Sequence, residues 1–467
     1  MKTPEKKSSN RTVWDEKNTP YELTGKIGEG GQGMVCSTQY PNVLVKVSKH
    51  PSSDPQTRAW HKHVQWVARQ PLENLHIARP QAMIVKPRPG YVMELMDGLE
   101  PLQAMLDSSF NALRDGNGLT GFRNTGGLSR RVRVLARLAR LLASLHGRAL
   151  AYGDLSPTNI FVSRSHEHAE VWLIDCDNIS VLCREGAQKI YTREYGAPEV
   201  LRRDSGINSL TDSWSFAVIA FQMLTLLHPL RGDLVDNGDP DLVEQALRGD
   251  FPWIDHLSDD RNRASHGLSR ADHLTTRLRA QFEQCFNVGM HEPGERPSMA
   301  AWAEAFEAAE MMLARCSQDD GCGSSFFFNT RRQCPFCDFV QAPERFLVLR
   351  HFVYAPLSDL GEGAKGRDQW LPTQHYQLVS DAQVELRSSP IGSSFYVESP
   401  VVGRLDLFEQ GLWIEPLSSH PMSLQRDKSV ERVKRRMLLK TEWKKDSNLV
   451  LHLGDVGKAH AAWRFKW

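Results

Sequence analysis

The residues of this chain that could do chemistry begin with a glycine-rich turn, a lysine and two loop residues, in that order. The segment 28–33 reads Gly-Glu-Gly-Gly-Gln-Gly, Lys46 follows in an apolar strand, and Asp154 and Asn159 lie further along the chain. Glycines lack a Cβ, so such a turn can close over a triphosphate and offer its N–H groups. A lysine is rarely buried without a partner, which favours a phosphate-binding role for Lys46.

The spacing of Asp154 and Asn159 suits the same reaction. The carboxylate can accept the proton of a hydroxyl nucleophile while the amide oxygen holds a metal ion. The apolar run 171–174 ends in Asp175, a position suited to Mg²⁺ coordination. Two unrelated loop aspartates are the alternative, but the order of the motifs favours phosphoryl transfer. A strand rather than a helix follows the glycine turn, which argues against a dinucleotide site.

The elements expected to position these residues are strands first and helices later. Hydrophobic patterning predicts a disordered tail over 1–20, strands over 23–27, 34–38, 43–47, 82–85 and 91–95, and a helix over 57–69. After Gly98 the chain is mostly helical, with helices predicted over 130–145 and 299–315. The polar segments 115–127 and 232–267 are predicted to be loops.

Length and composition set limits on the class of protein. The 467 residues are enough for two or three domains, and 57 basic against 56 acidic side chains indicate neither a nucleic-acid nor a membrane partner. The amino terminus has no secretory pattern, and the apolar run 214–227 is too short to span a bilayer. Eight cysteines without an export signal favour a reducing compartment, so we expect a cytoplasmic protein.

Four cysteines gather between residues 316 and 337. Cys334 and Cys337 flank a Pro-Phe turn, and Cys316 and Cys322 precede them at wider spacing. Thiolates prefer tetrahedral Zn²⁺, so the cluster predicts a structural zinc site, although the wide first spacing leaves open that one ligand comes from elsewhere. A redox dithiol at Cys334 and Cys337 is the alternative, but it would leave two cysteines unexplained.

Three later segments complete a pattern that resembles a known family. Residues 192–199 end in Ala-Pro-Glu199, residues 212–216 open an apolar helix, and Arg296 lies in Glu-Arg-Pro-Ser. With the motifs above, residues 21 to about 313 resemble a bacterial protein kinase domain of the eukaryotic (Hanks) type. The resemblance implies an α+β, two-lobed fold, with a β-rich N-lobe over 21–96 and a helical C-lobe over 97–313. It also implies that Arg296 pairs with Glu199.

The resemblance implies a role for each motif residue. Gly28, Gly30 and Gly33 would lie over the phosphates of ATP, and Lys46 would contact the α- and β-phosphates. Asp154 would be the catalytic base, and Asn159 and Asp175 would hold Mg²⁺ or Mn²⁺. Adenine would be read by the backbone of residues 94–96, including Glu94 and Met96, with Met93 as gatekeeper and Val35, Val45 and Phe161 as apolar walls.

The chain departs from the family pattern at four places. Tyr152-Gly153-Asp154 lacks the usual arginine that clamps a phosphorylated activation segment, and Ser156 replaces a lysine near the transferred phosphoryl group, which predicts slower chemistry. Asp175-Cys176-Asp177 loses the usual glycine. The helix predicted over 57–69 has no acidic residue to pair with Lys46, and both Gln65 and Glu73 remain open as its partner.

The carboxy-terminal part predicts a zinc ribbon over 314–342 and a β-rich interaction or regulatory module over 343–467. A solvated helix explains the basic run between Arg426 and Lys445 better than a face that binds single-stranded nucleic acid. A kinase domain followed by these parts resembles the kinases of bacterial stress systems associated with tellurite resistance. That resemblance implies a von Willebrand A-domain protein as substrate and a metal-dependent phosphatase as a second partner.

Together these features predict an ATP- and Mg²⁺-dependent protein serine/threonine kinase that also carries structural Zn²⁺. A nucleotide-binding pseudokinase scaffold that recruits partners through its tail is the main alternative. A small-molecule phosphotransferase is a third hypothesis, and the peptide-docking features at residues 197–199 and at Arg296 count against it.

Overall fold

The computed structural model describes residues 11–29, 33–94, 96–182, 191–317, 322–329, 331–357, 369–380, 383–389 and 399–467. The chain divides into two compact units. The first comprises residues 1–126, 137–268 and 279–303, and the second comprises residues 127–136, 269–278 and 304–467. The first unit contains the residues predicted for phosphoryl transfer, and the second contains the four clustered cysteines.

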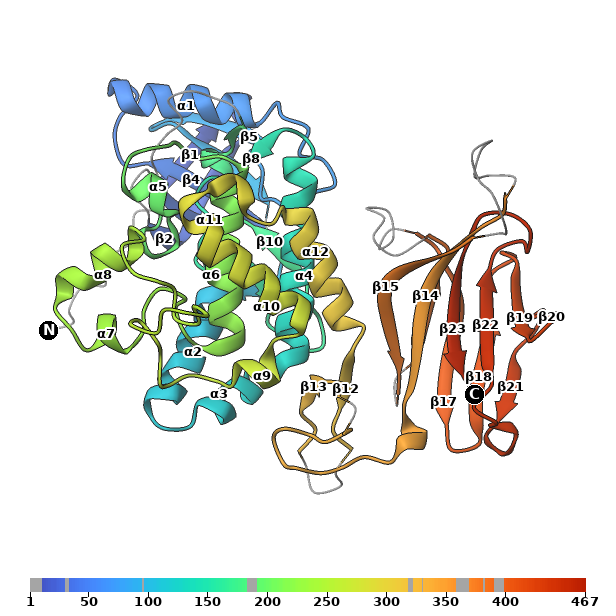
Figure 1. Cartoon of the computed structure of the whole chain (residues 1–467). Helices are drawn as coiled ribbons and strands as arrows, with labels where there is room; N and C mark the ends of the chain where they lie inside the picture. The colour runs from blue at the N-terminus through green and yellow to red at the C-terminus, as the bar shows by residue number, and fades with distance from the viewer. Residues whose placement is uncertain are drawn as a thin grey trace, which may run out of the picture. The chain divides into compact units, whose positions relative to one another are not determined.

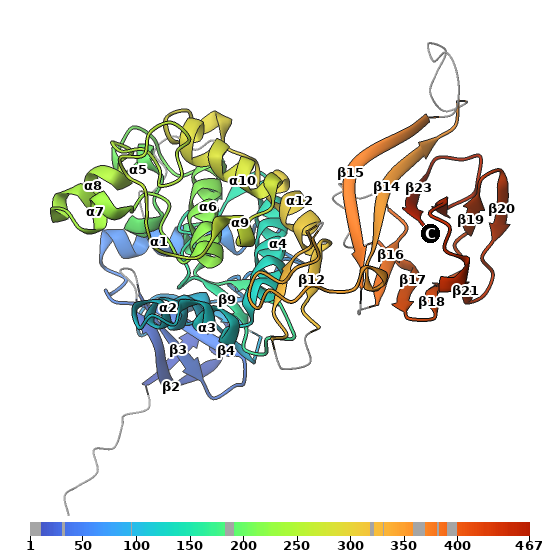
Figure 2. The ribbon, with the colours of Figure 1, turned by 60° about the horizontal axis from the view of Figure 1, so that its bottom comes forward.

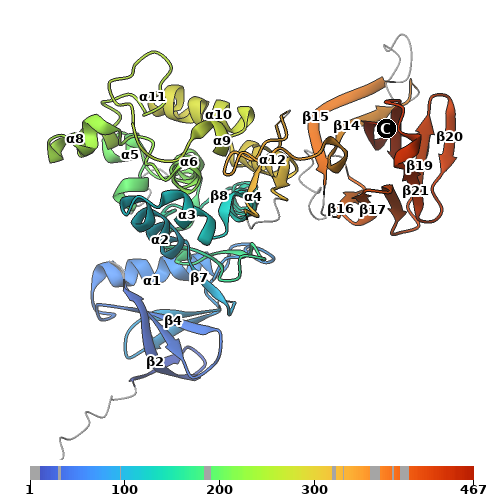
Figure 3. The same cartoon turned by 90° about the horizontal axis from the view of Figure 1, so that it is seen from below.

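The amino-terminal strands close into an antiparallel barrel in the order β1-β2-β3-β4-β6-β5. Their bounds are β1 Arg11–Asp15, β2 Pro20–Glu29, β3 Gly33–Thr38, β4 Val43–Ser48, β5 Ala82–Lys86 and β6 Gly90–Glu94. Alternation along the strands sends one set of valines and isoleucines, among them Val13, Val45 and Ile84, into the barrel core. Helix α1 (Pro55–Val67) lies across the barrel and packs its buried Trp60 and Val64 on a second cluster (Figure 3).

The amino-terminal end differs from the prediction of a disordered tail over 1–20. Residues 11–15 form strand β1, which pairs with both β2 and β5 and so closes the barrel. Val13 is buried, and the carboxylate of Asp15 accepts the N–H groups of Lys17 and Thr19, each at 2.8 Å. The buried side chains of Val13 and Asp15 and the pairing with β2 and β5 hold this strand, and its five residues are too few to give a pattern in the sequence. Residues 1–10 lie outside the described residues.

The helical part is built around α6 (Ser209–Thr225), which is labelled in Figure 1 and whose residues from Thr211 to Thr225 are all buried. Its helices are α2 Leu102–Arg114, α3 Gly118–Asn124, α4 Gly127–His146, α5 Pro198–Leu201, α6 Ser209–Thr225, α7 Asp233–Asp236, α8 Pro240–Leu247, α9 Arg270–His273, α10 Thr276–Glu283, α11 Gly289–His291 and α12 Met299–Glu310. Helices α3, α7 and α8 fall within segments predicted to be loops. Each has eight residues or fewer, and glycines or aspartates lie inside or next to each of them, which hides these helices from sequence patterning. No helix in the described part of the chain is long and apolar enough to cross a membrane.

Short strands and 3₁₀ turns carry the loops between these helices. They are β7 Leu99–Pro101, β8 Leu150–Ala151, β9 Ile160–Ser163, β10 Val171–Leu173, β11 Ser180–Val181, η1 Cys176–Asn178 and η2 Arg193–Tyr195. Strand β9 pairs with both β7 and β10, and β8 pairs with β11. These small sheets fix the ends of the loops that contain Asp154, Asn159 and Asp175.

The second unit is mostly antiparallel sheet. Its strands are β12 Leu313–Arg315, β13 Ser325–Phe327, β14 Leu347–Ala355, β15 Gln369–Val379, β16 Val384–Arg387, β17 Val401–Phe408, β18 Gly411–Pro416, β19 Met422–Arg426, β20 Ser429–Arg432, β21 Met437–Lys440, β22 Asn448–Leu453 and β23 His460–Lys466. One sheet has the order β15-β14-β23-β22-β19-β20 and another the order β16-β17-β18-β21 (Figure 2). Leucines from both sheets share a single core cluster.

Two predictions for this unit are wrong in detail. The helix predicted to reach Arg315 ends at Glu310, because residues 313–315 pair with β13 as strand β12. The basic run from Arg426 to Lys445 is not a helix: it contains β20 and β21 and a 3₁₀ turn over 441–443. In this run β20 pairs with β19 and β21 pairs with β18, and the pattern of charges along the run does not show this pairing. Within the β-rich module predicted over 343–467, residues 358–368, 381–382 and 390–398 lie outside the described residues.

Candidate active site

Lys46 lies at the centre of the candidate site, on strand β4. Its side chain is 3% exposed, and its ammonium group contacts Asp175 Oδ1 and both carboxylate oxygens of Asp177, at 3.0 and 2.9 Å for the latter. Burial opposes the charged form, but the carboxylates of Asp177 and Asp175 outweigh it and raise the pKa of Lys46. The lysine is therefore held as an ammonium ion among acidic groups.

Asp177 was missed as a site residue, since its position was noted only for the loss of a glycine. Its side chain is fully buried, and its Oδ2 also accepts the indole N–H of Trp60 at 2.5 Å. Burial disfavours its ionised form, but Lys46 and these hydrogen bonds lower the pKa of Asp177 to about 2. The available signal was an acidic residue after Asp175 in a chain whose helix 57–69 contains none.

Asp175 is the more accessible of the two carboxylates. It is 25% exposed on its side chain and adopts a left-handed backbone conformation at φ 59°, just before the turn η1. Burial and the adjacent Asp177 raise the pKa of Asp175. Of the two sequence candidates for the partner of Lys46, Glu73 pairs instead with Arg79 at 2.8 Å, and Gln65 carries no charge.

Asp154 and Asn159 come together in the loop between β8 and β9. The amide nitrogen of Asn159 donates to the backbone oxygen of Asp154 at 2.9 Å, which leaves the amide oxygen as the group able to bind a metal. Thr192 donates both its N–H and its hydroxyl to Asp154 Oδ1, at 2.8 and 2.9 Å. The segment 192–199 was singled out from the sequence, but this contact, in which Thr192 fixes one oxygen of the Asp154 carboxylate, was missed.

The backbone around Asp154 is held by a buried aspartate of α6. Asp212 accepts the N–H groups of Tyr152 and Gly153 at 2.7 and 2.9 Å, and His146 lies 2.9 Å from it. The hydroxyl of Tyr152 donates to the Ile174 carbonyl, next to Asp175. Gly153 has φ +99°, and a Cβ there would lie 2.9 Å from the Asn178 backbone oxygen, so this position disfavours any side chain, including the usual arginine.

The glycines of the predicted phosphate turn differ in their surroundings. A Cβ on Gly33 would lie 2.7 Å from the backbone oxygen of Val47, so its absence lets β3 approach β4 closely. Among the described residues, a Cβ on Gly28 would meet no atom within 4 Å, so packing does not explain this glycine. Gly30 lies outside the described residues. The role of Gly28 over the phosphates of ATP stays a prediction.

The predicted adenine residues are partly reassigned. Val45 is fully buried in the barrel core, on the opposite face of β4 from Lys46, so it does not line the site. Successive strand residues alternate faces, and Leu44 shares the face of Lys46 and packs near Met93 and Val35. Glu94 ends β6 and is exposed, Met96 is 39% exposed, and Phe161 is buried on β9. The adenine roles of the residues other than Val45 stay predictions.

The implied pairing of Arg296 with Glu199 is confirmed. Two parallel hydrogen bonds of 2.8 Å join the guanidinium to the carboxylate, and both side chains are buried. Arg296 also donates to the Gly289 carbonyl at 2.8 Å and lies 4.8 Å from the ring of Trp214 on α6. The ion pair ties the end of the 192–199 segment to the central helix.

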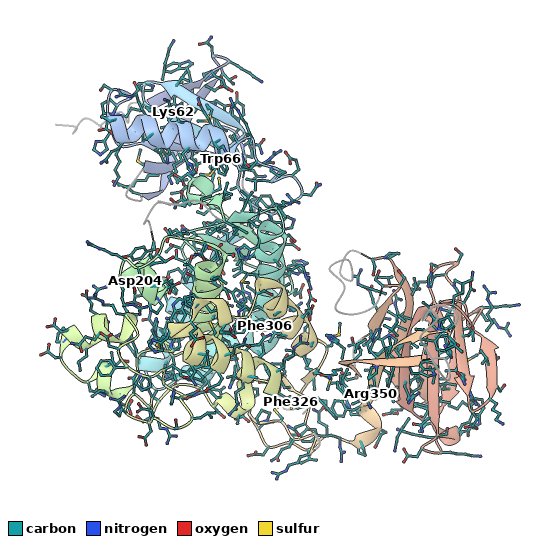
Figure 4. All side chains as sticks on the ribbon, turned by 45° about the horizontal axis from the view of Figure 1, so that its top comes forward. Lys62, Trp66, Asp204, Phe306, Phe326 and Arg350 are labelled. Atoms are coloured by element: carbon teal, nitrogen blue, oxygen red, sulfur yellow. The ribbon has the colours of Figure 1, made fainter. Side chains whose placement is uncertain are left out.

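The four cysteines of the second unit converge. Their sulfur atoms all lie within 4.8 Å of one another, with 3.5 Å from Cys316 to Cys337 and 3.8 Å from Cys322 to Cys334. Tetrahedral Zn²⁺ with Zn–S bonds of about 2.3 Å places its sulfurs about 3.8 Å apart, so the set fits such an ion. Burial opposes the thiolate of Cys322, yet hydrogen bonds from Ser324 and the other thiols lower its pKa to about 7. Phe326 on β13, labelled in Figure 4, packs in the same cluster.

Comparison with known proteins agrees with this geometry. The protein kinase domain family matches residues 21–287. The chain is 37% identical over 102 residues to mouse ribosomal protein S6 kinase alpha-2, covering 21% of this chain and 13% of that protein. It is 25% identical over 217 residues to the serine/threonine-protein kinase Pkn1 of Myxococcus xanthus, covering 44% of this chain and 29% of the relative.

A third relative is myosin light chain kinase A of Dictyostelium discoideum, 27% identical over 122 residues, with 26% of this chain and 40% of the relative covered. The chain thus spans less than half the length of each of these curated relatives. The family match covers more than half of this chain, and it includes the lysine, the loop with Asp154 and Asn159, and Asp175. The chain therefore belongs to the protein kinase family.

Proposed function

We propose that the chain transfers the γ-phosphate of Mg·ATP to serine or threonine hydroxyls of a protein. The observation that carries this proposal is the convergence of Lys46 with Asp175, and of Asp154 with Asn159 and Thr192, in one unit of the fold. These are the side chains that a phosphoryl transfer requires: an ammonium for phosphate, oxygen ligands for metal and a carboxylate for the proton. The serine/threonine kinases among the relatives support the choice of hydroxyl.

Each of these residues would have its own role in the reaction. Asp175 and the Asn159 amide oxygen would hold the metal ion, and Lys46 with the turn 28–33 would hold the triphosphate. Mg·ATP would supply the phosphoryl group and neutralise its charge. Asp154 accepts the proton of the incoming hydroxyl through the carboxylate oxygen that Thr192 leaves available. Ser156, which is fully buried and shares a 2.9 Å hydrogen bond with Thr158, provides no positive charge, so turnover at the low end for kinases is expected.

The test is transfer of label from γ-³²P-ATP with Mg²⁺ to the protein itself and to generic protein substrates. Replacing Asp154 by alanine should lower the rate by about 10²- to 10⁴-fold, the usual contribution of a general base. Asp204→Ala is the matched control, since Asp204 is an exposed carboxylate paired with Arg202 at 2.8 Å. Equal incorporation by the parent and Asp154→Ala, or none by any variant with Mg²⁺ or Mn²⁺, would overturn the assignment and favour a nucleotide-binding scaffold.

A structural Zn²⁺ at the four cysteines is a second part of the proposal. All four thiols converge, which a redox pair at Cys334 and Cys337 would not require. Elemental analysis of the purified protein should find one zinc per chain, and Cys334→Ser should lose it. Cys285→Ser, at a buried cysteine outside the cluster, is the control and should keep it. A protein without zinc that forms a Cys334–Cys337 disulfide would support the redox hypothesis instead.

The cellular role proposed here rests on domain order alone. A kinase domain followed by a cysteine site and a β-rich module suggests a cytoplasmic bacterial stress-response system of the kind associated with tellurite resistance. The substrate would be a von Willebrand A-domain protein, and a metal-dependent phosphatase would reverse the modification. Incubation of the kinase with such a protein should give phosphoserine or phosphothreonine, which mass spectrometry would locate, and the phosphatase should remove it.

A further inference from the structure

Asp177 makes contacts that are unusual for its place in the kinase pattern. Its fully buried carboxylate accepts hydrogen bonds from the ammonium group of Lys46, at 2.9 and 3.0 Å, and from the indole N–H of Trp60, at 2.5 Å. The Trp60 ring is itself packed against Tyr91, with ring centroids 6.1 Å apart. The two donors thus hold Asp177 from a strand and a helix at once.

Helix α1 provides a donor here where an acceptor is expected. Its buried residues are Thr57, Trp60, Val64 and Val67, and the sequence 55–67 contains no acidic residue. The helix therefore reaches the site through the N–H of Trp60, and the negative charge comes from η1, 117 residues further along the chain. Helix α1 thus contributes a hydrogen-bond donor to the site, where the kinase pattern predicts a carboxylate acceptor on this helix.

We infer that Asp177, held in place by Trp60, is the positioning residue that anchors Lys46, and that Asp175 is thereby left for the metal. This inference rests on the proposed function and deepens it. The two carboxylates differ in the way this division requires: Asp177 is fully buried, whereas Asp175 is 25% exposed. An inaccessible carboxylate can keep the lysine paired while the accessible one exchanges its partner.

A consequence is that the lysine anchor and the metal carboxylate belong to one short segment. Residues 175–178 are fixed by Cys176, whose thiol donates to the Ala78 carbonyl at 3.3 Å, and by the Ile179 N–H, which donates to the Cys176 carbonyl at 3.1 Å. Correct placement of this segment therefore sets the lysine and the metal ligand together. Helix α1 acts on both through one hydrogen bond.

The experiment compares Asp177→Asn, Trp60→Phe and the double variant in the full chain. Asp177→Asn should lower kcat/KM for protein phosphorylation by about 100-fold and weaken Mg·ATP binding. Trp60→Phe keeps an aromatic ring at this position but removes the indole N–H together with the five-membered ring. The lost hydrogen bond to a charged group should lower kcat/KM about tenfold. In the Asp177→Asn background, Trp60→Phe should have no further effect on kcat/KM. Trp66→Phe, on the same helix (Figure 4), is the matched control and should equal the parent.

A second readout does not depend on catalysis. Acetylation of Lys46 by acetic anhydride, measured by mass spectrometry against the exposed Lys62 as internal reference (Figure 4), should rise several-fold in Asp177→Asn and less in Trp60→Phe. A parent that transfers no phosphate would refute the proposed function but leave this comparison intact. Unchanged Lys46 labelling in a folded Asp177→Asn variant, or full additivity of the two substitutions in kcat/KM, would overturn the inference.

Discussion

The ion pair between Glu199 and Arg296 allows a quantitative prediction for stability. In Glu199→Gln one of the two 2.8 Å hydrogen bonds persists through the amide oxygen, while the amide N–H₂ group faces a guanidinium donor. Removing one charge of a buried pair costs about 3–5 kcal/mol. Arg296 keeps the carbonyl oxygens of Gly289 and Leu210, at 2.8 and 3.1 Å, so we expect the lower end of that range, about 3 kcal/mol.

Scanning calorimetry and urea unfolding of the full chain would measure this loss. A cost of about 3 kcal/mol corresponds to a fall in Tm of about 6–12 °C for a domain of this size. Glu244→Gln is the matched control: its partner Arg193 lies at the same 2.8 Å, but both side chains are 59% exposed. An exposed pair contributes less than about 1 kcal/mol, so this variant should unfold with the parent. Equal losses in the two variants would refute the argument that burial makes the Glu199 pair important.

Three further predictions concern three glycines and two buried histidines. Gly33→Ala should destabilise the protein by about 1–3 kcal/mol in thermal unfolding, because the added Cβ would meet a backbone oxygen. Gly28→Ala should leave Tm unchanged and raise the KM for ATP. Equal Tm values for the two variants would contradict this prediction. Gly153→Arg, which restores the usual kinase residue, should lower stability by about 1–3 kcal/mol, since its φ is +99° and the added Cβ has no room; a Tm at or above that of the parent would contradict it. Burial lowers the pKa of His351 and of His452 to about 4, so as the pH falls these histidines take up protons in the unfolded chain before they do in the folded one. The free energy of unfolding should therefore fall between pH 6.5 and 4 by about 1.4 kcal/mol per pH unit for each histidine. In urea unfolding, His452→Gln should show a shallower fall with pH than the parent.

Much of the candidate site was predictable because its chemistry demands particular residue types at particular spacings. Lys46, Asp154, Asn159 and Asp175 were identified from short segments, and the structure brings Lys46 to Asp175 and Asn159 to Asp154. The assignment of Val45 failed for a local reason. It is one residue from Lys46, and in a strand that places it on the opposite face, so Leu44 is the neighbour that shares the lysine's side.

The residues that sequence reasoning missed act through contacts that are distant along the chain. Trp60 and Asp177 are 117 residues apart, and Thr192 and Asp154 are 38 apart. A tryptophan on the apolar face of a helix is expected to pack in the hydrophobic core. Nothing in the spacing of Trp60 shows that its indole N–H donates to a carboxylate. Strand β1 was missed for a related reason, because its five residues are stabilised by pairing with β2 and β5 rather than by their own pattern.

The sequence by itself determined which reaction components the chain contains: glycines without side chains, a lysine in an apolar strand, carboxylates and an amide in loops, and four clustered thiols. These are local properties, since side-chain chemistry and short-range spacing do not depend on the rest of the fold. The tertiary structure alone decided which of these groups meet. Lys46 is paired by Asp177 and not by Gln65 or Glu73, because a buried ammonium must be neutralised by whichever carboxylate the packing of α1, β4 and η1 brings within reach.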